Sequence, residues 1–542
     1  MKNKFIRIEI TLSDTGQPIV EIKSENLNVI ESQIFTYISN EQVECALPHH
    51  DFTDTANFSK KNKGVLVHRD KQKVKISNDP FCTIPLYYFK TSEKIIITSE
   101  PYDFNTLGDA DIDQAGLWES ILFGSCLWNR TLFKGLFQLP SASELIVTDE
   151  GLSLERYWDF NVEEDSSLKN EKNLIEALDS KLTDIFTNLP EKPYLMGISG
   201  GLDSRLSAAY LHKANKAHLV KTFTYCSTKQ SLDYQLAKKV CHHYGLKEPS
   251  LHILNEASYR SQLNFLSKYT CGQIGIQHSH ICSVLESNFK PRTDTQISNY
   301  FSDALFGFDC SGNKHISMGS DSLTRTLNST DGLSMDIRCE IEADISNIFS
   351  GFNPDANYSS LNEYKYVTER NQKFHMNLAF QQSRFMDTCL PYANSGLLEF
   401  MMSVPLPLRK HKKVLDLLFE SGAVKGFEIA DISSRHFIAG NEFSNQGIQS
   451  LIKKFDFKLQ NTLSALIAKV TQGKMIYPNK YHTESHVNML HKFSGELKVA
   501  CDSLYQAGIF NEEQQKTLST IPVKSGGVSE RFQVLSLISL LQ

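Results

Sequence analysis

The 542-residue sequence lacks the features that mark membrane-spanning, nucleic-acid-binding and secreted proteins. No stretch approaches the roughly 18 uncharged apolar residues of a membrane-spanning helix. The chain carries 56 basic and 62 acidic residues, and a net charge of −6 without a basic block argues against nucleic-acid binding. A signal peptide, internal repeats and low-complexity tracts are also absent, so we expect a globular protein that stays in the cytoplasm.

The 11 cysteines form no CxxC motif, and their number is odd. In a long chain this pattern favours reduced thiols and a cytoplasmic location over a disulfide framework. One cluster has a spacing that could bind zinc, although helix-facing polar residues beside a cleft are the simpler interpretation. Its members are Cys271, His278, His280 and Cys282.

The hydrophobic fraction of 41% is ample for buried cores, and the length predicts more than one domain. Residues 1–160 are mostly β-like. The polar stretch 161–172 shows no periodicity, and we interpret it as a linker. The β-like segments are residues 1–10, Lys73–Ile76, Glu93–Thr98 and Glu144–Thr148.

After the linker the pattern changes to alternating helix and strand. Residues 173–189 have helical spacing, and the apolar run 193–198 reads as a strand followed by a glycine-rich turn. This alternation predicts an α/β domain with a parallel sheet over residues 173–542. From about residue 360 the chain reads as mainly helical, including residues 448–470 and 532–541.

The stretch Tyr194–Leu206 carries the strongest chemical signal. It runs from an apolar strand through Ser-Gly-Gly-x-Asp-Ser into a helical pattern. Glycines let a backbone approach an anion closely and adopt turn conformations, and a helix start offers N–H groups to phosphate. The serines add hydroxyl donors, and Asp203 fits a Mg²⁺ ligand. The bland alternative is a capped glycine turn. The predicted binding residues are Ile198, Ser199, Gly200, Gly201, Leu202, Asp203 and Ser204.

This segment resembles the pyrophosphate loop of the N-type ATP pyrophosphatases, and it lacks the Gly-Lys-Ser/Thr of a Walker loop. The resemblance implies ATP and Mg²⁺ as cofactors. It also implies cleavage between the α and β phosphates, with AMP attached to an oxygen of the substrate.

Further stretches resemble asparagine-synthetase-like proteins. Lys221–Tyr225 looks like the family's second strand, which implies that Tyr225 contacts the adenine. Ser298–Gly307 resembles SG(D/E)G(S/G)DELFGG, a partial match. It implies that Ser298 and Asn299 touch the nucleotide and that Asp303 is a second Mg²⁺ ligand beside Asp203; a plain surface-loop role for Asp303 is the alternative.

The N-terminal part also resembles this family. The resemblance implies an Ntn-hydrolase-like β-sandwich of the glutamine amidotransferase type over residues 1–160, followed by a doubly wound parallel-sheet PP-loop ATPase domain. Glutamine-hydrolysing members carry a nucleophilic cysteine directly after Met, whereas this chain has Lys2, so we expect no glutaminase activity. The matching segments are residues 79–88, 98–100, 131–140 and 156–158.

Tyr300 stands where asparagine synthetases carry an acid, and in this it resembles β-lactam synthetases. The resemblance makes Tyr300 a candidate base or orienting group, with aromatic packing as the alternative. Its partner stays open among His375, Asp387 and Glu369. Leu390–Asn394 resembles the family's VPFLD, and this alignment puts Asp387 where those proteins have Glu.

The family's downstream R-x-K motif is incomplete here. Arg435 matches its arginine, but no lysine follows at the expected position. A missing cation would cost several kcal/mol of transition-state stabilisation unless another group replaced it. His436, Lys412 and Lys413 are the candidate replacements.

These features predict an ATP-dependent ligase that activates a small-molecule or peptide carboxylate as an acyl-adenylate and passes it to ammonia or an amine. Whether the protein forms a homodimer is left open. Two other functions compete. One is a nucleotide-binding scaffold or regulator without catalysis, favoured by the missing lysine. The other is a PP-loop enzyme of tRNA modification, which a gel shift with tRNA would test.

Overall fold

The computed structural model describes most of the chain and forms two compact units. Unit 1 comprises Met1–Asn170, Lys268–Ile274 and Tyr300–Lys413, and unit 2 comprises Glu171–Ser267, Gly275–Asn299 and Val414–Gln542. The described residues are 4–12, 18–31, 35–39, 55–105, 111–270, 272–288, 295–317, 319–424, 448–471, 475, 486–522 and 528–537.

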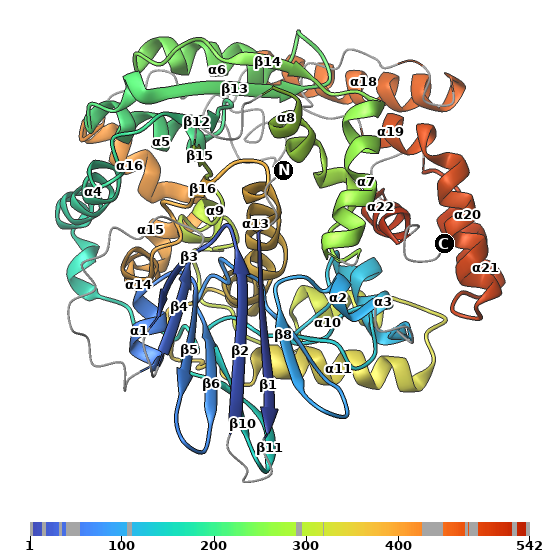
Figure 1. Cartoon of the computed structure of the whole chain (residues 1–542). Helices are drawn as coiled ribbons and strands as arrows, with labels where there is room; N and C mark the ends of the chain where they lie inside the picture. The colour runs from blue at the N-terminus through green and yellow to red at the C-terminus, as the bar shows by residue number, and fades with distance from the viewer. Residues whose placement is uncertain are drawn as a thin grey trace. The chain divides into compact units, whose positions relative to one another are not determined.

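Unit 1 contains two antiparallel sheets (Figure 1). One has the strand order β2-β1-β8-β7-β9, and the other β11-β10-β6-β5-β4-β3. The strands are β1 (Phe5–Leu12), β2 (Pro18–Glu25), β3 (Asn28–Glu31), β4 (Phe35–Ser39), β5 (Val65–Arg69), β6 (Val74–Asn78), β7 (Tyr87–Lys90), β8 (Ile95–Thr98), β9 (Phe137–Gln138), β10 (Ser143–Thr148) and β11 (Gly151–Arg156).

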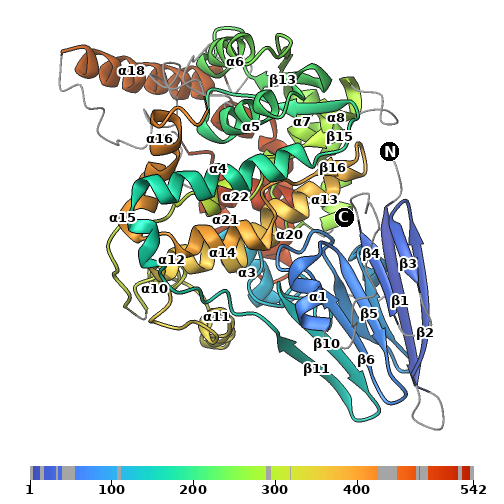
Figure 2. The same ribbon diagram turned by 90° about the vertical axis from the view of Figure 1, so that its left-hand side faces the viewer.

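The apolar faces of the two sheets share one core. Alternate residues of β1 point inward, since Ile6, Ile8 and Ile10 are buried, as the period of two in a strand requires. The same cluster includes Val67 of β5 and Leu145 of β10, which belong to the other sheet. Figure 2 shows the long strands of both sheets lying side by side.

Three helices of unit 1, α1, α2 and α3, lie between strands in the sequence, and the later helices, which follow the sheets, include a π-helix. A π-helix is rare, and where it occurs it often accompanies a functional site. The elements are α1 (Thr55–Lys61), α2 (Tyr102–Asn105), α3 (Gln114–Phe123), a 3₁₀ turn (Ser166–Lys169), α9 (Ser302–Leu305), α10 (Ser322–Asn328), α11 (Met335–Phe349), α12 (Leu361–Lys365), the π-helix η4 (Tyr366–Met376), α13 (Asn377–Ser383), β16 (Thr388–Cys389), α14 (Ser395–Ser403), α15 (Leu406–Arg409) and a 3₁₀ turn (Lys410–Lys412).

Buried polar contacts join residues 300–413 to the sheets and make unit 1 discontinuous in sequence. Gln372 Nε2 donates to the Pro80 carbonyl at 3.2 Å. Arg384, which is fully buried, pairs with Glu100 at 3.0 Å. An unpaired charge at such depth would be costly, so the Arg384–Glu100 pair fixes the C-terminal end of α13. The expected division into residues 1–160 and 173–542 stays a prediction.

Unit 2 contains parallel strands in the order β14-β13-β12-β15. The helix α4 buries Leu174, Leu178 and Leu182 at helical spacing. The elements are α4 (Glu171–Thr187), β12 (Tyr194–Gly197), α5 (Leu202–Lys213), a 3₁₀ turn (Ala217–Leu219), β13 (Val220–Cys226), α6 (Leu232–His243), β14 (Ser250–Ile253), α7 (Glu256–Thr270), a 3₁₀ turn (Ile276–His278), α8 (His280–Asn288), β15 (Thr295–Ile297), α16 (Lys413–Glu420), α18 (Ile448–Thr471), α19 (His486–Lys492), α20 (Ser494–Gln506), α21 (Glu512–Ser519) and α22 (Val528–Ser536).

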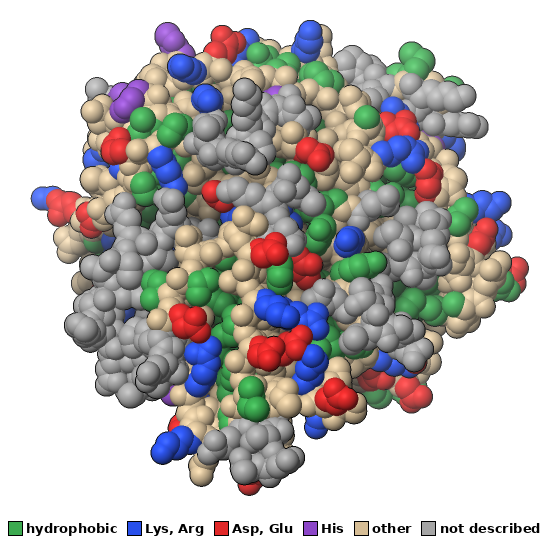
Figure 3. Space-filling view, in the orientation of Figure 1, with side chains coloured by type: hydrophobic (Ala, Val, Ile, Leu, Met, Phe, Trp, Pro, Cys, Tyr) green, Lys and Arg blue, Asp and Glu red, His purple; other side chains and the backbone are tan. Residues whose placement is uncertain are grey.

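The predicted mixture of antiparallel and parallel sheets with helices is confirmed. The predicted linker 161–172 contains a short 3₁₀ turn, and α4 already begins at Glu171. None of the helices in the described ranges is long and apolar enough to cross a membrane. On the face drawn in Figure 3, the coloured basic and acidic side chains are interspersed.

Candidate functional site

The Ser-Gly-Gly-x-Asp-Ser loop lies at a topological switch point of the parallel sheet. The chain runs from β12 to β13 and β14, then returns to β15 on the other side of β12. Residues 198–201 follow β12, and residues 298–299 follow β15. Ligands of open α/β sheets bind at the carboxyl ends of the strands where the order reverses. The two predicted nucleotide segments therefore flank the expected binding edge.

Ile198 and the two serines hold the loop in shape. Ile198 continues the pairing with β13, because its N–H donates to the Phe223 carbonyl at 2.9 Å. Ser199 N–H donates to Ser204 Oγ at 3.2 Å, and Gly201 N–H donates to Ser199 Oγ at 3.1 Å. The hydroxyls that the sequence assigns to a ligand thus also close the loop on itself.

The glycines of the loop serve close packing rather than an unusual backbone conformation. Gly201 has φ −73° and ψ 153°, which any residue adopts, and Gly200 also lacks a positive φ. A Cβ at Gly200 would lie only 2.5 Å from Leu236 Cδ1 on α6. The expectation that these glycines supply special turn conformations is therefore corrected: Gly200 is needed because α6 packs directly against it.

Three backbone N–H groups in the loop and the first turn of α5 are candidate donors to a ligand. Within the described part of the chain, the N–H groups of Gly200, Leu202 and Ser204 have no hydrogen-bond partner. They sit at the positive end of the α5 dipole, where an anion is stabilised. Asp203, in the first turn of α5, adds a carboxylate suited to a hard cation. This arrangement can bind a phosphate group with its metal.

The other predicted nucleotide residues of unit 2 lie at the same sheet edge. Tyr225, near the end of β13, packs its ring 4.6 Å from that of His280. Ser298 is buried after β15, and Asn299 accepts a 2.7 Å hydrogen bond from Ser207 of α5. That bond links the two predicted nucleotide segments within unit 2.

The second predicted segment continues into a strained turn of unit 1. Phe301 stands at the fourth position of SG(D/E)G(S/G)DELFGG, where the motif has glycine, and its φ is 78°. A non-glycine residue in this left-handed region is strained by about 1–2 kcal/mol. The buried ring packs edge-on against Phe81 at 4.8 Å, which offsets that cost.

Asp303, the predicted second metal ligand, forms an ion pair with Lys412. Lys412 Nζ lies 2.5 Å from Asp303 Oδ1, and both side chains are at least three-quarters buried. His411 and Lys412 have φ values of 52° and 63°, so the backbone presenting this lysine is strained as well. Such strain concentrates at functional sites. Lys412, a candidate replacement for the missing motif lysine, is therefore paired with Asp303, the predicted second metal ligand.

Tyr300 lies between an amide and an imidazole. Gln382 Nε2 donates to the Tyr300 hydroxyl at 2.9 Å. The ring of His375, on η4, stacks on Tyr300 with centroids 5.4 Å apart and planes at 14°. His375 Nδ1 is 2.7 Å from Asn371 Oδ1, an acceptor, so this nitrogen carries the proton. The Tyr300 hydroxyl therefore accepts a hydrogen bond from an amide, while the phenol ring packs on an imidazole.

The structure separates the three candidate partners of Tyr300. His375 lies beside it, as described. Asp387 instead pairs at 2.8 Å with Lys4, which is fully buried. Glu369 accepts a hydrogen bond from the Trp128 N–H, and burial raises the pKa of Glu369 to about 7. His375 is thus the partner that the fold favours.

Several predictions fall on residues outside the described ranges. They concern Arg435, His436, Lys2 and Cys271, the last of which leaves the zinc alternative undecided. Among the residues that the structure does describe, no group of three or more His, Cys, Asp or Glu side chains could hold a metal. Asp203 belongs to unit 2 and Asp303 to unit 1.

Sequence reasoning missed two residues that touch the predicted ones. Gln382 carries no motif, so only its contact with Tyr300 reveals it. Arg205 directly follows the loop and is fully buried, and its Nη2 donates to the Gly200 carbonyl at 3.0 Å. A charged residue at a core-facing helical position after the motif was the available signal.

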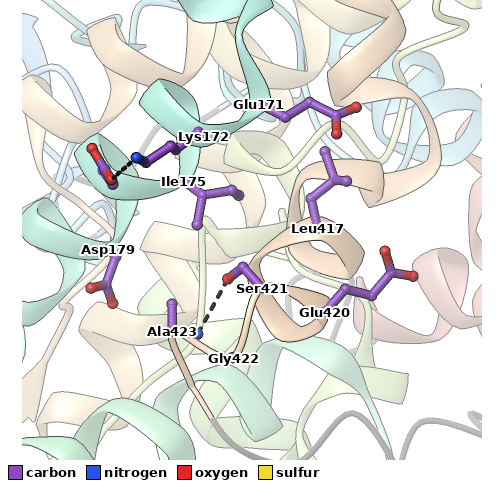
Figure 4. Close-up of a pocket in the computed structure, with 10 residues that line it drawn as sticks. Glu171, Lys172, Ile175, Asp179, Leu417, Glu420, Ser421, Gly422 and Ala423 are labelled. Carbon is purple, nitrogen blue, oxygen red and sulfur yellow. Dashed lines mark hydrogen bonds and ion pairs between the residues drawn. The ribbon is translucent and has the colours of Figure 1, made fainter.

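Unit 2 also has an open groove of about 620 Å³ between α4 and the end of α16 (Figure 4). Most of its charged side chains are acidic, and Glu171, Asp179 and Glu420 are labelled in the close-up. Asp179 is already neutralised by Lys213 at 2.5 Å. The groove involves none of the predicted site residues.

No family model and no curated protein matches this chain. Two solved structures align weakly. The allosteric regulatory enzyme of purine biosynthesis aligns over 46% of this chain and 74% of its own, with 9% identity and a TM-score of 0.19. Glutamine phosphoribosylpyrophosphate amidotransferase from B. subtilis, complexed with ADP and GMP, aligns over 54% and 75%, with 8% identity and a TM-score of 0.16. Neither alignment is close enough to support a conclusion about this chain.

Proposed function

We propose that this protein is an ATP-dependent ligase that activates a carboxylate as an acyl-adenylate and transfers the acyl group to ammonia or an amine. In this proposal the antiparallel domain is a retained amidotransferase-like fold without glutaminase activity. The observation that carries the proposal is the loop at Ser199–Ser204. Its three open N–H groups, at the switch point of a parallel sheet, form an anion cradle.

Each step has residues of this chain to serve it. The N–H groups of Gly200, Leu202 and Ser204 would take the phosphate oxygens of ATP. A substrate carboxylate oxygen attacks the α-phosphorus and pyrophosphate leaves. The nitrogen nucleophile then attacks the acyl carbon and AMP leaves. Tyr300, in its tyrosinate form and with His375 stacked on it, would accept the proton of that nitrogen and then release it to solvent.

The two predicted metal ligands differ in how well they fit Mg²⁺. Asp203 fits, because a carboxylate beside open phosphate donors is a usual magnesium ligand. Mg²⁺ held there would neutralise charge on the leaving pyrophosphate. Asp303 is already paired with Lys412, so a cation would have to displace the ammonium group. The reaction is therefore proposed with Asp203 as its principal metal ligand.

The test is ATP–pyrophosphate exchange by the full chain with Mg²⁺ and a panel of carboxylic acids that includes aspartate. Exchange that depends on one acid, and that Asp203→Ala abolishes, supports the ligase. The matched control is Asp184→Ala, the same change at an exposed position of α4, which should leave exchange intact. Exchange that persists in Asp203→Ala would contradict the assigned role of this loop.

A second function is favoured by the Lys412–Asp303 pair. If the ammonium group permanently blocks that carboxylate, the protein binds nucleotide without turning it over, as a scaffold or regulator. Tight binding of ATP by the wild type with no pyrophosphate release for any acid, together with release that appears only in Lys412→Gln, would favour this function over the ligase.

A further inference from the structure

Arg205 is buried in a way that ordinary packing does not explain. Its side chain is 0% exposed, and it sits one helical turn after Gly201 on α5. Helical side chains lean towards the helix N-terminus, so the guanidinium reaches back beneath the loop. Its Nη2 donates to the Gly200 carbonyl at 3.0 Å.

The other donors of this guanidinium are unsatisfied. Arg205 Nε and Nη1 have no hydrogen-bond partner among the described residues. Burial disfavours the charged guanidinium, and the carboxylate of Asp416 acts in the opposite direction. A buried charge without full pairing is strongly unfavourable unless another charge compensates it. An anion bound at the loop, whose Gly200 carbonyl accepts from Arg205, would supply the compensating negative charge.

We propose that Arg205 is a positioning residue of the phosphate loop and a fixed positive charge behind it. Holding the Gly200 carbonyl turns that oxygen away from the N–H cradle, so a ligand anion meets donors rather than an acceptor. The charge itself then strengthens the binding of the triphosphate or of pyrophosphate. This inference rests on the proposed nucleotide function of the same loop.

Asp416 makes the electrostatic part of this proposal testable on its own. It lies on α16, and its carboxylate opposes the field of Arg205. Burial, followed by the neighbouring Glu420, raises the pKa of Asp416 to about 6, so it is ionised at pH 8. Removing this charge should strengthen the net positive field at the loop.

The experiment measures the affinity of the full chain for Mg·ATP and for pyrophosphate by calorimetry at pH 8. We expect Arg205→Met to weaken both by about tenfold or more, and Arg205→Lys to weaken them less because the charge is retained. Asp416→Asn should tighten both by about twofold to fivefold. Because a buried charge is screened little, the Arg205→Met loss should persist at high salt.

The outcomes separate the inference from the function on which it rests. A wild-type chain that binds neither ligand overturns the proposed function. A wild type that binds both, with affinities unchanged in Arg205→Lys and Asp416→Asn, overturns the inference. Asp416→Asn keeps the test decisive even if Arg205→Met does not fold, because a purely structural arginine predicts no gain from that change. Far-UV circular dichroism establishes that each variant is folded.

Discussion

The Ser199–Ser204 loop and the Tyr300–Asp303 turn were both predicted to belong to the nucleotide site, but they differ in backbone conformation and contacts. The loop keeps both glycines of its motif and has no positive φ at either of them, and three of its N–H groups have no partner among the described residues. The turn has Phe301 in place of glycine and a left-handed backbone, and its carboxylate is paired with Lys412.

The two segments are therefore held in place by different kinds of contact. The conformation of the loop is fixed by Leu236, which packs against Gly200, and by Arg205, which donates to the Gly200 carbonyl. Neither contact uses the N–H groups that the proposal assigns to a ligand. The turn is fixed by its own side chains, through the Phe301–Phe81 contact and the lysine bridge. Under the proposed function, the loop could take a ligand without rearrangement, whereas Asp303 would have to release Lys412 before it could take a cation.

The largest effect is expected at Gly200. Gly200→Ala puts a Cβ against Leu236, so it should lower ATP–pyrophosphate exchange at least about 100-fold and destabilise the fold by about 1–3 kcal/mol. Gly201→Ala is the matched control. Its Cβ would meet only Ser199 Oγ at 3.2 Å, and a loss below about fivefold is expected.

Rescue sharpens this test. In the double variant Gly200→Ala with Leu236→Ala the 2.5 Å contact with Cδ1 is removed, whereas the 2.9 Å contact with the residue 236 Cβ remains, so exchange should recover only in part. If Gly200→Ala alone behaves like Gly201→Ala, packing by α6 does not shape the loop.

The helix η4, which carries His375 beside the turn, should make stability depend on pH. Burial raises the pKa of Glu369 from 4.5 to about 7, so its neutral form is favoured in the folded state. The contribution of protonated Glu369 to the free energy of unfolding is therefore fully present below pH 4.5 and is lost as the pH rises through 7. The free energy of unfolding should fall by up to about 3 kcal/mol over this range.

Urea unfolding of Glu369→Gln across this range measures the effect. The variant should be more stable than the wild type near neutral pH and should show a flatter dependence on pH. Glu342→Gln, an exposed change on α11, should leave the wild-type pH profile intact. An unchanged profile in Glu369→Gln would mean that Glu369 titrates normally.

The Lys412 bridge should compete with a metal. Lys412→Gln removes the ammonium group from Asp303, so the Mg²⁺ concentration that gives half-maximal exchange should fall about threefold to tenfold. Lys410→Gln, an exposed change two residues away, is the control. A rise in the Mg²⁺ requirement would show instead that the lysine itself supplies the positive charge.

The smallest effect tests the backbone of the turn. Phe301→Gly and Phe301→Ala remove the same ring, but only alanine keeps the left-handed strain, so the glycine variant should be more stable by about 1 kcal/mol. At Phe306, which is equally buried and has φ −91°, the order should reverse. Urea unfolding of the four variants decides the point, and an advantage for alanine at residue 301 would contradict it.

Short-range patterns predicted much of the fold. Strand β10 and helix α4 lie within about two residues of the expected ranges, because alternation and helical spacing report which face is buried. The loop at 198–204 was predictable for a similar reason, since its motif is contiguous. Unit 1 was not, because Arg384–Glu100 and other contacts across hundreds of residues leave no local pattern.

The site divides in the same way. The sequence alone determined which residues form the loop, that Tyr300 lies in the second predicted segment, and that Lys2 follows Met1. Tertiary structure alone decided that His375 rather than Asp387 stacks on Tyr300, that Lys412 occupies Asp303, and that Arg205 lies beneath Gly200. The physical reason is that a motif fixes local backbone and chemistry, whereas the burial and pairing of a charge depend on segments brought together only by folding.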